Sequence, residues 1–167
     1  GKIVLSAQTW NGESVGSYIR LNGNGTRDTG FALRGSSYFV TSTAIEALPD
    51  GRYLVAGTTN SVRTDFNGVL RLNADGQVDP TFHTASPYTL GAGVNDILVQ
   101  PDGRILVGGT FRVRGLPDGS SLVVGVVRLL PDGRPDPDFN GVPQLSQSLD
   151  AKVGDVRRLA LQADGRI

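Results

Sequence analysis

The sequence contains no cysteine and no methionine, and it has a single histidine. Without cysteine there is no disulfide bond, no thiol nucleophile and no thiolate metal site. No apolar run approaches the roughly 20 residues of a membrane-spanning helix, so we expect no membrane insertion. An excess of charge is also lacking, because 16 basic residues balance 16 acidic ones. A neutral chain without a basic stripe is not expected to bind nucleic acid.

Residues that favour helices are scarce. Only two glutamates and two lysines occur among 167 residues, whereas glycine occurs 23 times and valine is frequent. Six of the 14 aspartates directly precede a glycine. Asp-Gly pairs mark tight turns, because glycine accepts a positive φ and aspartate bonds back to its own backbone. The composition therefore predicts an all-β protein.

One sequence pattern recurs along the chain. Residues 51–58 (GRYLVAGT) return as residues 103–110 (GRILVGGT), and the pattern also begins at Gly1 and, cut short, at Gly165. Repeats of this length indicate stacked or radial copies of one supersecondary unit. The recurring glycines define repeat units at 1–50, 51–102 and 103–164, with residues 165–167 starting a further unit.

Each repeat unit contains four short segments in a fixed order. In the second unit these are the run from Gly51, a run at 68–73, a turn followed by Asp-Pro-Thr-Phe at 79–82, and an alternating run at 94–100. Four antiparallel strands in about 50 residues are the size of one β-propeller blade. We predict that residues 1–167 form part of a single β-propeller domain, with four-stranded antiparallel blades of about 50–60 residues. Three blade-equivalents cannot close a ring, so other chain segments or other copies would complete it.

The repeat residues also resemble a known family. Residues 71–82 (RLNADGQVDPTF) and 100–109 (QPDGRILVGG) are similar to the delta-60 repeat of bacterial β-propeller domains. The resemblance covers nearly the whole chain and is weakest at 28–31, where Asp-Pro-x-Phe has lost its proline. It implies a propeller that is secreted, periplasmic or attached to the cell surface. It brings no catalytic residues and no cofactor.

An arginine precedes an aspartate by eight residues in every unit. A three-residue hairpin loop between them would place both side chains opposite each other on one face of the sheet. The neighbours on that face are apolar, and a lone charge there would be costly. We therefore predict structural ion pairs, bidentate where the geometry allows, at Arg20–Asp28, Arg71–Asp79 and Arg128–Asp136. A ring of binding arginines is the alternative, but a binding site on a propeller is normally asymmetric.

Candidate chemical sites are few. Residues 73–79 partly match a calcium loop, but they begin with asparagine and lack the closing glutamate, so no metal site is expected. His83 has no nucleophile and carboxylate nearby in sequence, and we expect an exposed turn residue. Glu46 is unusual, because it lies on an expected strand where the other units have Leu98 and Ala160. We predict no catalytic, metal-binding or cofactor-binding residues and hence no enzyme.

The segments that vary in length between units are expected to form loops. The loops around Trp10, 60–67 and 112–121 would form a recognition surface, since aromatic and arginine side chains commonly anchor partners. The alternative is that the aromatic residues only cap blade edges. The candidate recognition residues are Trp10, Phe111, Arg112 and Arg114.

Taken together, these features favour a non-enzymatic scaffold or interaction module. We expect it to be secreted, periplasmic or at the cell surface, and to bind a protein partner, join a larger assembly or pack against remaining blades of the same protein. A carbohydrate-binding or carbohydrate-active propeller, with a glycan as its ligand, is the alternative.

Overall fold

The computed structural model describes residues 1–7, 9–14, 18–31, 41–58, 68–83, 88–89, 93–113, 122–139 and 156–162. These residues form antiparallel strands and turns and contain no helix. The strands are β1 (Ile3–Ser6), β2 (Thr9–Trp10), β3 (Glu13–Ser14), β4 (Tyr18–Leu21), β5 (Thr41–Ala47), β6 (Tyr53–Thr58), β7 (Val69–Leu72), β8 (Tyr88–Thr89), β9 (Val94–Val99), β10 (Ile105–Val113) and β11 (Leu122–Leu129).

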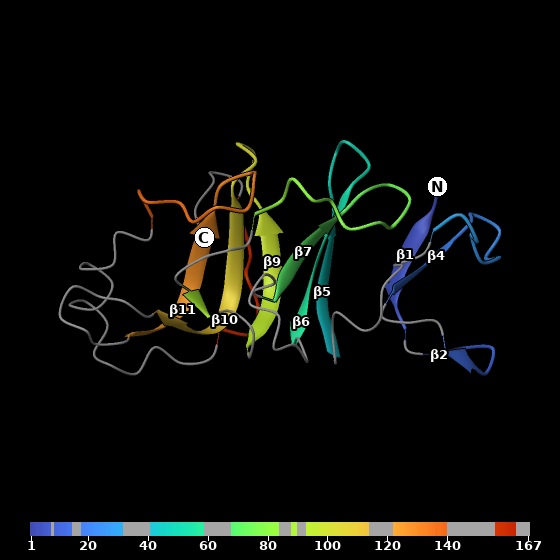
Figure 1. Ribbon diagram of the computed structural model, residues 1–167, viewed down its shortest axis with the longest axis horizontal. Helices are drawn as coiled ribbons and strands as arrows, with labels where there is room; N and C mark the ends of the chain where they lie inside the picture. The colour runs from blue at the N-terminus through green and yellow to red at the C-terminus, as the bar shows by residue number, and fades with distance from the viewer. Residues whose placement is uncertain are drawn as a thin grey trace.

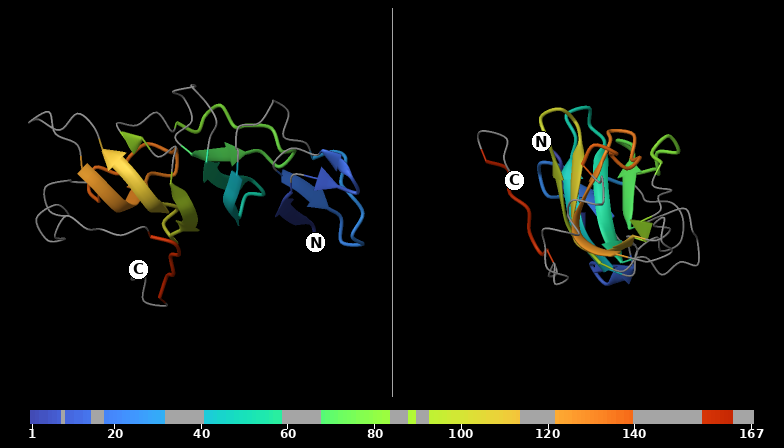
Figure 2. Two further views of the ribbon diagram at one scale, coloured as in Figure 1. Left: turned by 90° about the horizontal axis from the view of Figure 1, so that it is seen from below. Right: turned by 90° about the vertical axis from the view of Figure 1, so that its left-hand side faces the viewer.

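Three sheets follow one another in chain order along the long axis of the molecule (Figure 1). Blade 1 is formed by β1 and β4, blade 2 by β5, β6 and β7, and blade 3 by β9, β10 and β11. β8 pairs with the far end of β10, and β2 and β3 form a separate hairpin. Viewed along the long axis, the sheets lie one behind another, as successive propeller blades do (Figure 2).

The blades in space are out of phase with the repeat units by one strand. β5 belongs to the first repeat unit in sequence, yet it pairs with β6 from Ala47↔Tyr53 to Thr41↔Thr58. β9 pairs with β10 of the next unit in the same way. The short hairpin turn between the two strands of each pair explains this phase, because it joins the end of one unit directly to the start of the next.

The same hairpin turn recurs within the described residues. In the turn at 73–77, the backbone N–H of Gly76 donates to the carbonyl of Asn73 at 2.9 Å, and Gly76 has a φ of 87°. Asp75 Oδ1 accepts a hydrogen bond from the N–H of Gln77 at 3.0 Å. This is the three-residue loop that the Asp-Gly pairs predict. Equivalent turns lie at 22–26, 48–52, 100–104 and 130–134.

The hairpin turns at 22–26, 73–77 and 130–134 are each followed by a segment that forms a single β-bridge in place of a fourth strand. The bridges are Leu21↔Arg27, Leu72↔Val78 and Leu129↔Pro135. The aspartate next to the bridge ends the ladder: Asp79 Oδ1 accepts a hydrogen bond from the N–H of Thr81 at 2.9 Å and turns the chain away. Within the described residues, blades 2 and 3 therefore hold three long strands and one bridge each.

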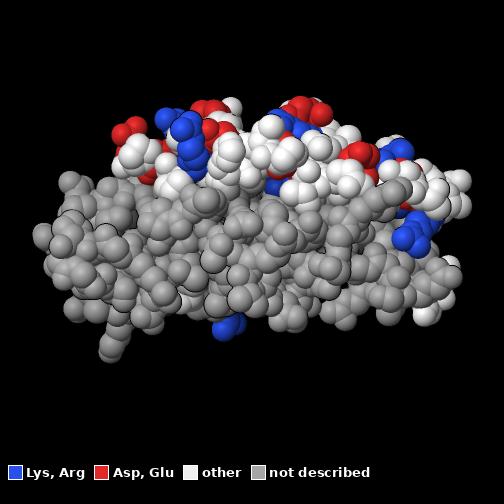
Figure 3. Space-filling model, in the orientation of Figure 1, with Lys and Arg blue, Asp and Glu red and all other residues white. Residues whose placement is uncertain are grey.

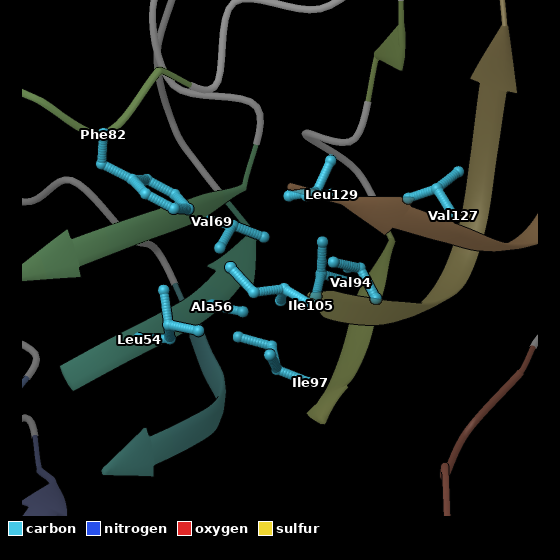
Figure 4. Close-up of a cluster of buried hydrophobic side chains, with 10 residues drawn as sticks. Leu54, Ala56, Val69, Phe82, Val94, Ile97, Ile105, Val127 and Leu129 are labelled. Atoms are coloured by element: carbon cyan, nitrogen blue, oxygen red, sulfur yellow. The ribbon is translucent and has the colours of Figure 1, made fainter. Parts of the chain in front are cut away.

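The apolar core lies between the blades. On β6, Leu54 and Ala56 belong to the cluster shared with blade 3 (Figure 4). Val55 belongs to the cluster shared with blade 1. All three side chains are fully buried. Alternate residues of a strand face opposite sides, so a strand between two blades must be apolar throughout. Burial on both faces therefore explains the continuous apolar run that follows each Gly-Arg dipeptide in the sequence.

Residues 156–162 lie against β9 and β10, as β9 lies against β5 and β6. Thr43 Oγ1 donates to the carbonyl of Val94 at 2.7 Å, and Asn95 Nδ2 donates to the carbonyl of Val156 at 3.0 Å. The donors occupy equivalent positions on β5 and β9, and the acceptors occupy equivalent positions on β9 and the segment at 156–162. The first strand of blade 2 and the first strand of blade 3 are therefore each tied to the next equivalent segment by the same kind of hydrogen bond.

Gly108 makes the approach of this last segment possible. A Cβ atom at Gly108 would lie 3.0 Å from Val156 Cγ1 and 3.2 Å from Leu159 Cγ. These separations are shorter than ordinary van der Waals contacts. Glycine at this point of β10 lets the segment at 156–162 pack directly on the sheet.

Candidate functional site

The three Arg–Asp pairs predicted from the sequence are ion pairs in the structure. The hairpin brings each pair together: the backbone N–H of Asp79, for example, donates to the carbonyl of Arg71 at 2.8 Å. Asp79 and Asp136 are buried, with exposed fractions of 5% and 1%. The Nε–Oδ2 distances are 2.9 Å for Arg20–Asp28, 2.8 Å for Arg71–Asp79 and 2.8 Å for Arg128–Asp136.

The bidentate geometry allowed for in the sequence analysis is not formed at Arg71. Its Nε contacts Asp79, but its Nη1 donates to the carbonyl of Pro131 at 2.7 Å and its Nη2 donates to Thr81 Oγ1 at 3.1 Å. The guanidinium thus divides its donors among a carboxylate, a hydroxyl and a backbone carbonyl. Pro131 lies in the hairpin turn of blade 3, so this arginine connects two blades.

Each aspartate of these pairs has a second cationic partner. The partner is the basic residue that follows the glycine at the start of every repeat unit. Sequence reasoning missed this role, although the recurrence of Gly-Lys or Gly-Arg was visible. The contacts with the aspartate Oδ2 are Lys2 Nζ–Asp28 at 2.5 Å, Arg52 Nη1–Asp79 at 2.9 Å and Arg104 Nε–Asp136 at 3.0 Å.

A phenylalanine completes each group. Arg71 Cζ lies 4.8 Å from the ring centre of Phe82, and the equivalent distances are 4.8 Å for Arg20–Phe31 and 4.5 Å for Arg128–Phe139. Such cation–π contacts add to the ion pairs. They explain the constant separation of arginine and phenylalanine in the repeats. We name each set of paired arginine, aspartate and phenylalanine, together with its second cation, an Arg–Asp–Phe cluster.

The clusters keep their aspartates charged. The hydrogen bond from Lys2 is the main cause that lowers the pKa of Asp28 to about 2, with help from Arg20. Burial by itself would raise the pKa of Asp79, but hydrogen bonds from Thr81 and Arg71 outweigh it and hold that pKa well below its ordinary value. A carboxyl group with a lowered pKa does not exchange protons near neutral pH, so these aspartates are unsuited to acid–base catalysis.

Other contacts also link neighbouring blades. Arg20 Nη1 donates to the carbonyl of Ala74 in the turn of blade 2, as Arg71 does to the turn of blade 3. Tyr18 Oη donates to the carbonyl of Ala56 at 3.1 Å, and burial raises the pKa of Tyr18 to about 12. His83, exposed as expected, donates its backbone N–H to the carbonyl of Asp132 at 2.8 Å.

Trp10, expected in a recognition loop, lies on a strand. It belongs to β2 and pairs with Glu13 of β3. A two-residue turn with positive φ joins them, at 49° for Asn11 and 83° for Gly12. These values match a type I′ turn, which favours a tight hairpin over an open loop.

Phe111 and Arg112 also lie on a strand where the sequence analysis placed a loop. β10 continues past an irregularity after Gly108, and Phe111 and Arg112 pair with Val124 and Val123 of β11. The strand therefore extends to Val113, beyond the apolar run at 105–109 of the repeat pattern. Arg114, the loop at 60–67 and residues 114–121 lie outside the described residues.

A pocket with a volume of about 550 Å³ lies between blades 2 and 3. Its walls come from β5 and β6 of blade 2, from the end of β9 and the start of β10 of blade 3, and from the turns between these strands. The charged residues on its lining are Glu46, Asp50, Arg52 and Arg71. On the face that Figure 3 shows, charged side chains of the described residues gather along the upper edge, with both signs interspersed.

The described residues form neither a metal site nor a membrane-spanning helix. No group of three or more histidine, cysteine, aspartate or glutamate side chains is placed there to hold a metal ion. Nor do those residues include a helix long and apolar enough to cross a membrane.

Antiparallel sheets that pack on one another in chain order, tied together by one repeated set of contacts, are arranged as successive blades of a β-propeller are. The chain belongs to the β-propeller family described as a domain of unknown function (DUF5122), which it matches over residues 1–31, 48–82 and 100–139. This is the delta-60 repeat-type family that the sequence resembles. No curated protein matches the chain. Each matched segment contains one complete Arg–Asp–Phe cluster, so the family pattern coincides with the framework of the blades.

Proposed function

We propose that this protein is a non-enzymatic β-propeller scaffold that presents a recognition surface to a protein partner or a larger assembly. We further propose that it acts outside the cytoplasm, as a secreted, periplasmic or surface-attached module. The observation that carries the proposal is that the repeated charged residues pair with one another. In the described part of the chain, the cluster aspartates each contact two cations, which supports a framework role for them.

The electrostatics of the clusters support a framework role. General acid–base catalysis requires a group whose pKa lies near the working pH. Contacts with the neighbouring cations and hydrogen-bond donors lower the pKa of Asp28, Asp79 and Asp136. A lowered pKa keeps these groups in one charge state near neutral pH, which supports a role in holding the blades together over a role in proton transfer.

Recognition is then assigned to the segments between the framework residues. The insertions around 60–67 and 112–121 and the hairpin that carries Trp10 differ from unit to unit. Segments that vary on a constant scaffold are where propellers and other repeat proteins place their binding residues. We assign the partner contacts to Trp10, Phe111, Arg112 and Arg114.

The test compares the protein with a variant in which Trp10, Phe111, Arg112 and Arg114 are replaced by alanine. Both are used as bait in culture supernatant, and each bound protein is then purified and its affinity measured by titration. We expect a partner whose affinity falls at least about tenfold in the variant, while the free energy of unfolding measured in urea stays within about 0.5 kcal/mol. Turnover of a glycoside, ester or peptide substrate would contradict the non-enzymatic role. A glycan ligand lost in the same variant would favour the carbohydrate-binding alternative.

A further inference from the structure

Glu46 departs from the repeat at a position where the other units are apolar. It lies on β5, opposite Leu54 of β6, and the equivalent residues are Leu98 and Ala160. It also lies outside the segments that match the family. Glu46 lies on the first strand of blade 2, and the framework does not require a charged residue there. Its presence needs another explanation.

Two acceptor groups that have no hydrogen-bond donor among the described residues line the pocket between blades 2 and 3. Glu46 makes no hydrogen bond or ion pair with the residues that the structure describes, and its side chain is half-buried. Gln100 Oε1 is buried and has no hydrogen-bond donor among those residues. A buried acceptor without a donor costs free energy, and a ligand that donates hydrogen bonds would recover it.

The remaining charges of the pocket are matched. Arg52 contacts Asp50 at 2.6 Å and Asp79 at 2.9 Å, and Arg71 contacts Asp79 at 2.8 Å. The unmatched charge on the lining is therefore the negative charge of Glu46. Burial is the main cause that raises the pKa of Glu46, and the nearby charge of Asp96 on β9 adds to it. A cation close to Glu46 would relieve both effects.

The rest of the lining is mostly aliphatic. Leu48 and Leu54 come from blade 2, Val99 and Ile105 from blade 3, and Leu161 from the segment at 156–162. The volume of about 550 Å³ is typical of pockets that hold small organic molecules. Two oxygen acceptors among aliphatic side chains do not suit a metal ion such as Ca²⁺, which takes six to eight oxygen ligands. A neutral polyol would leave the charge of Glu46 unmatched.

We propose that this pocket binds an organic ammonium ion with an aliphatic stem. The ammonium group donates hydrogen bonds to the carboxylate of Glu46 and to Oε1 of Gln100, and the stem packs on the aliphatic lining. An ammonium has three donors, so it can serve both acceptors at once. The same chemistry is found in a free alkylamine and in a lysine side chain of a peptide. This inference is independent of the proposed scaffold role.

The first experiment uses the unaltered protein. Hexylammonium, hexan-1-ol and hexanoate are compared by saturation-transfer NMR and calorimetric titration at pH 7. We expect hexylammonium to bind at least about tenfold more tightly than hexan-1-ol, because a charge-assisted hydrogen bond contributes that much, and hexanoate to bind least. Equal affinities for hexylammonium and hexan-1-ol would overturn the proposal without recourse to any variant.

Variants then locate the site. Glu46→Gln removes the charge with little change in shape, and Glu46→Leu introduces the residue that the second unit carries at the equivalent position, Leu98. Each is expected to weaken hexylammonium at least about tenfold, and Gln100→Leu is expected to weaken it less. Asp75→Asn, which removes a charge from an exposed turn outside the pocket, is the control and should leave the affinity unchanged. Affinity that survives in both Glu46 variants would refute the assignment.

A final arm separates the two sources of the ammonium group. Nα-acetyl-lysine methylamide and its ε-acetylated form are titrated beside hexylammonium. Tighter binding of the lysine derivative, lost on ε-acetylation, would identify a peptide lysine as the ligand. Tighter binding of hexylammonium would identify a free amine. Tighter binding of the ε-acetylated form than of either cation would overturn the proposal.

Discussion

Arg71 in blade 2 donates a hydrogen bond from Nη1 to the carbonyl oxygen of Pro131 in blade 3, at 2.7 Å. The same guanidinium pairs with the buried Asp79 of its own blade at 2.8 Å. Arg20 repeats this arrangement one blade earlier, with Asp28 and the carbonyl of Ala74. The repeated arginine therefore holds the end of its own blade and fixes the position of the next one.

Replacing Arg71 by alanine should lower the free energy of unfolding by about 3 kcal/mol, because removing one partner leaves the buried Asp79 with an incompletely matched charge. Arg71→Lys should recover only part of this loss, since an ammonium cannot make all the contacts of the guanidinium. Urea unfolding followed by circular dichroism measures both changes.

The matched control for Arg71 is Arg134→Ala. Arg134 pairs with Asp132 at 2.7 Å, but 65% of its side chain is exposed. Exposed pairs contribute little, so a loss below about 0.5 kcal/mol is expected. Equal losses at positions 71 and 134 would mean that the inter-blade hydrogen bond and the burial of Asp79 do not matter.

Stability should fall in acid. The pKa of Asp28 is lowered to about 2, and the pKa values of Asp79 and Asp136 are also lowered. A pKa that is lower in the folded state means that the unfolded chain binds more protons. The contribution is complete above about pH 5 and is lost as the pH falls from about 4 towards the folded-state pKa values.

Urea midpoints at pH 7, 5, 4, 3 and 2 measure the acid effect. Asp79→Asn should unfold at lower urea at pH 7 but should lose less stability between pH 5 and 2. A midpoint for the unaltered protein that is the same at pH 3 and pH 7 would contradict the role of these aspartates.

Two glycines with positive φ separate backbone strain from steric contact. Gly51 has a φ of 85° and open space around it, whereas Gly133 has a φ of 90° and would place a Cβ atom 2.8 Å from the carbonyl oxygen of His83. Gly51→Ala should cost about 1 kcal/mol through strain alone. Gly133→Ala should cost at least about 1 kcal/mol more, because it also disturbs the contact between blades 2 and 3. Thermal or urea unfolding measures the difference, and equal costs would place the contact in doubt.

Tyr18→Phe should cost about 1 kcal/mol at pH 7, because it removes the hydrogen bond from Tyr18 Oη to the carbonyl of Ala56. Burial raises the pKa of Tyr18 to about 12, above the ordinary value of 10.0. The folded state therefore holds this proton longer than the unfolded chain does, and stability should fall as the pH rises from 10 towards 12. The phenylalanine variant should lose this part of the alkaline fall, as urea midpoints at pH 8, 10 and 11 would show. A fall of the same size in both proteins would assign it to other groups.

Local patterns predicted much of the fold and part of the framework. The Asp-Gly turns, the apolar runs and the eight-residue spacing of Arg71 and Asp79 are short-range signals, and a hairpin converts such spacing directly into contact. The second cation Arg52 could not be derived in this way, because it lies 27 residues from Asp79 and outside the hairpin that brings Arg71 and Asp79 together. Phe111 and Arg112 were placed in a loop for a similar reason: the length of β10 depends on its pairing with β11.

The sequence by itself determined an all-β repeat, its hairpin turns and its Arg–Asp pairs, because these depend on residues within one hairpin. Only the tertiary structure decided how one blade contacts the next: that Arg71 reaches Pro131, and that Glu46 and Gln100 line one pocket. Those relationships depend on the spacing and rotation between sheets. Backbone twist and side-chain packing across the whole interface set that spacing and rotation, and no short segment of sequence encodes them.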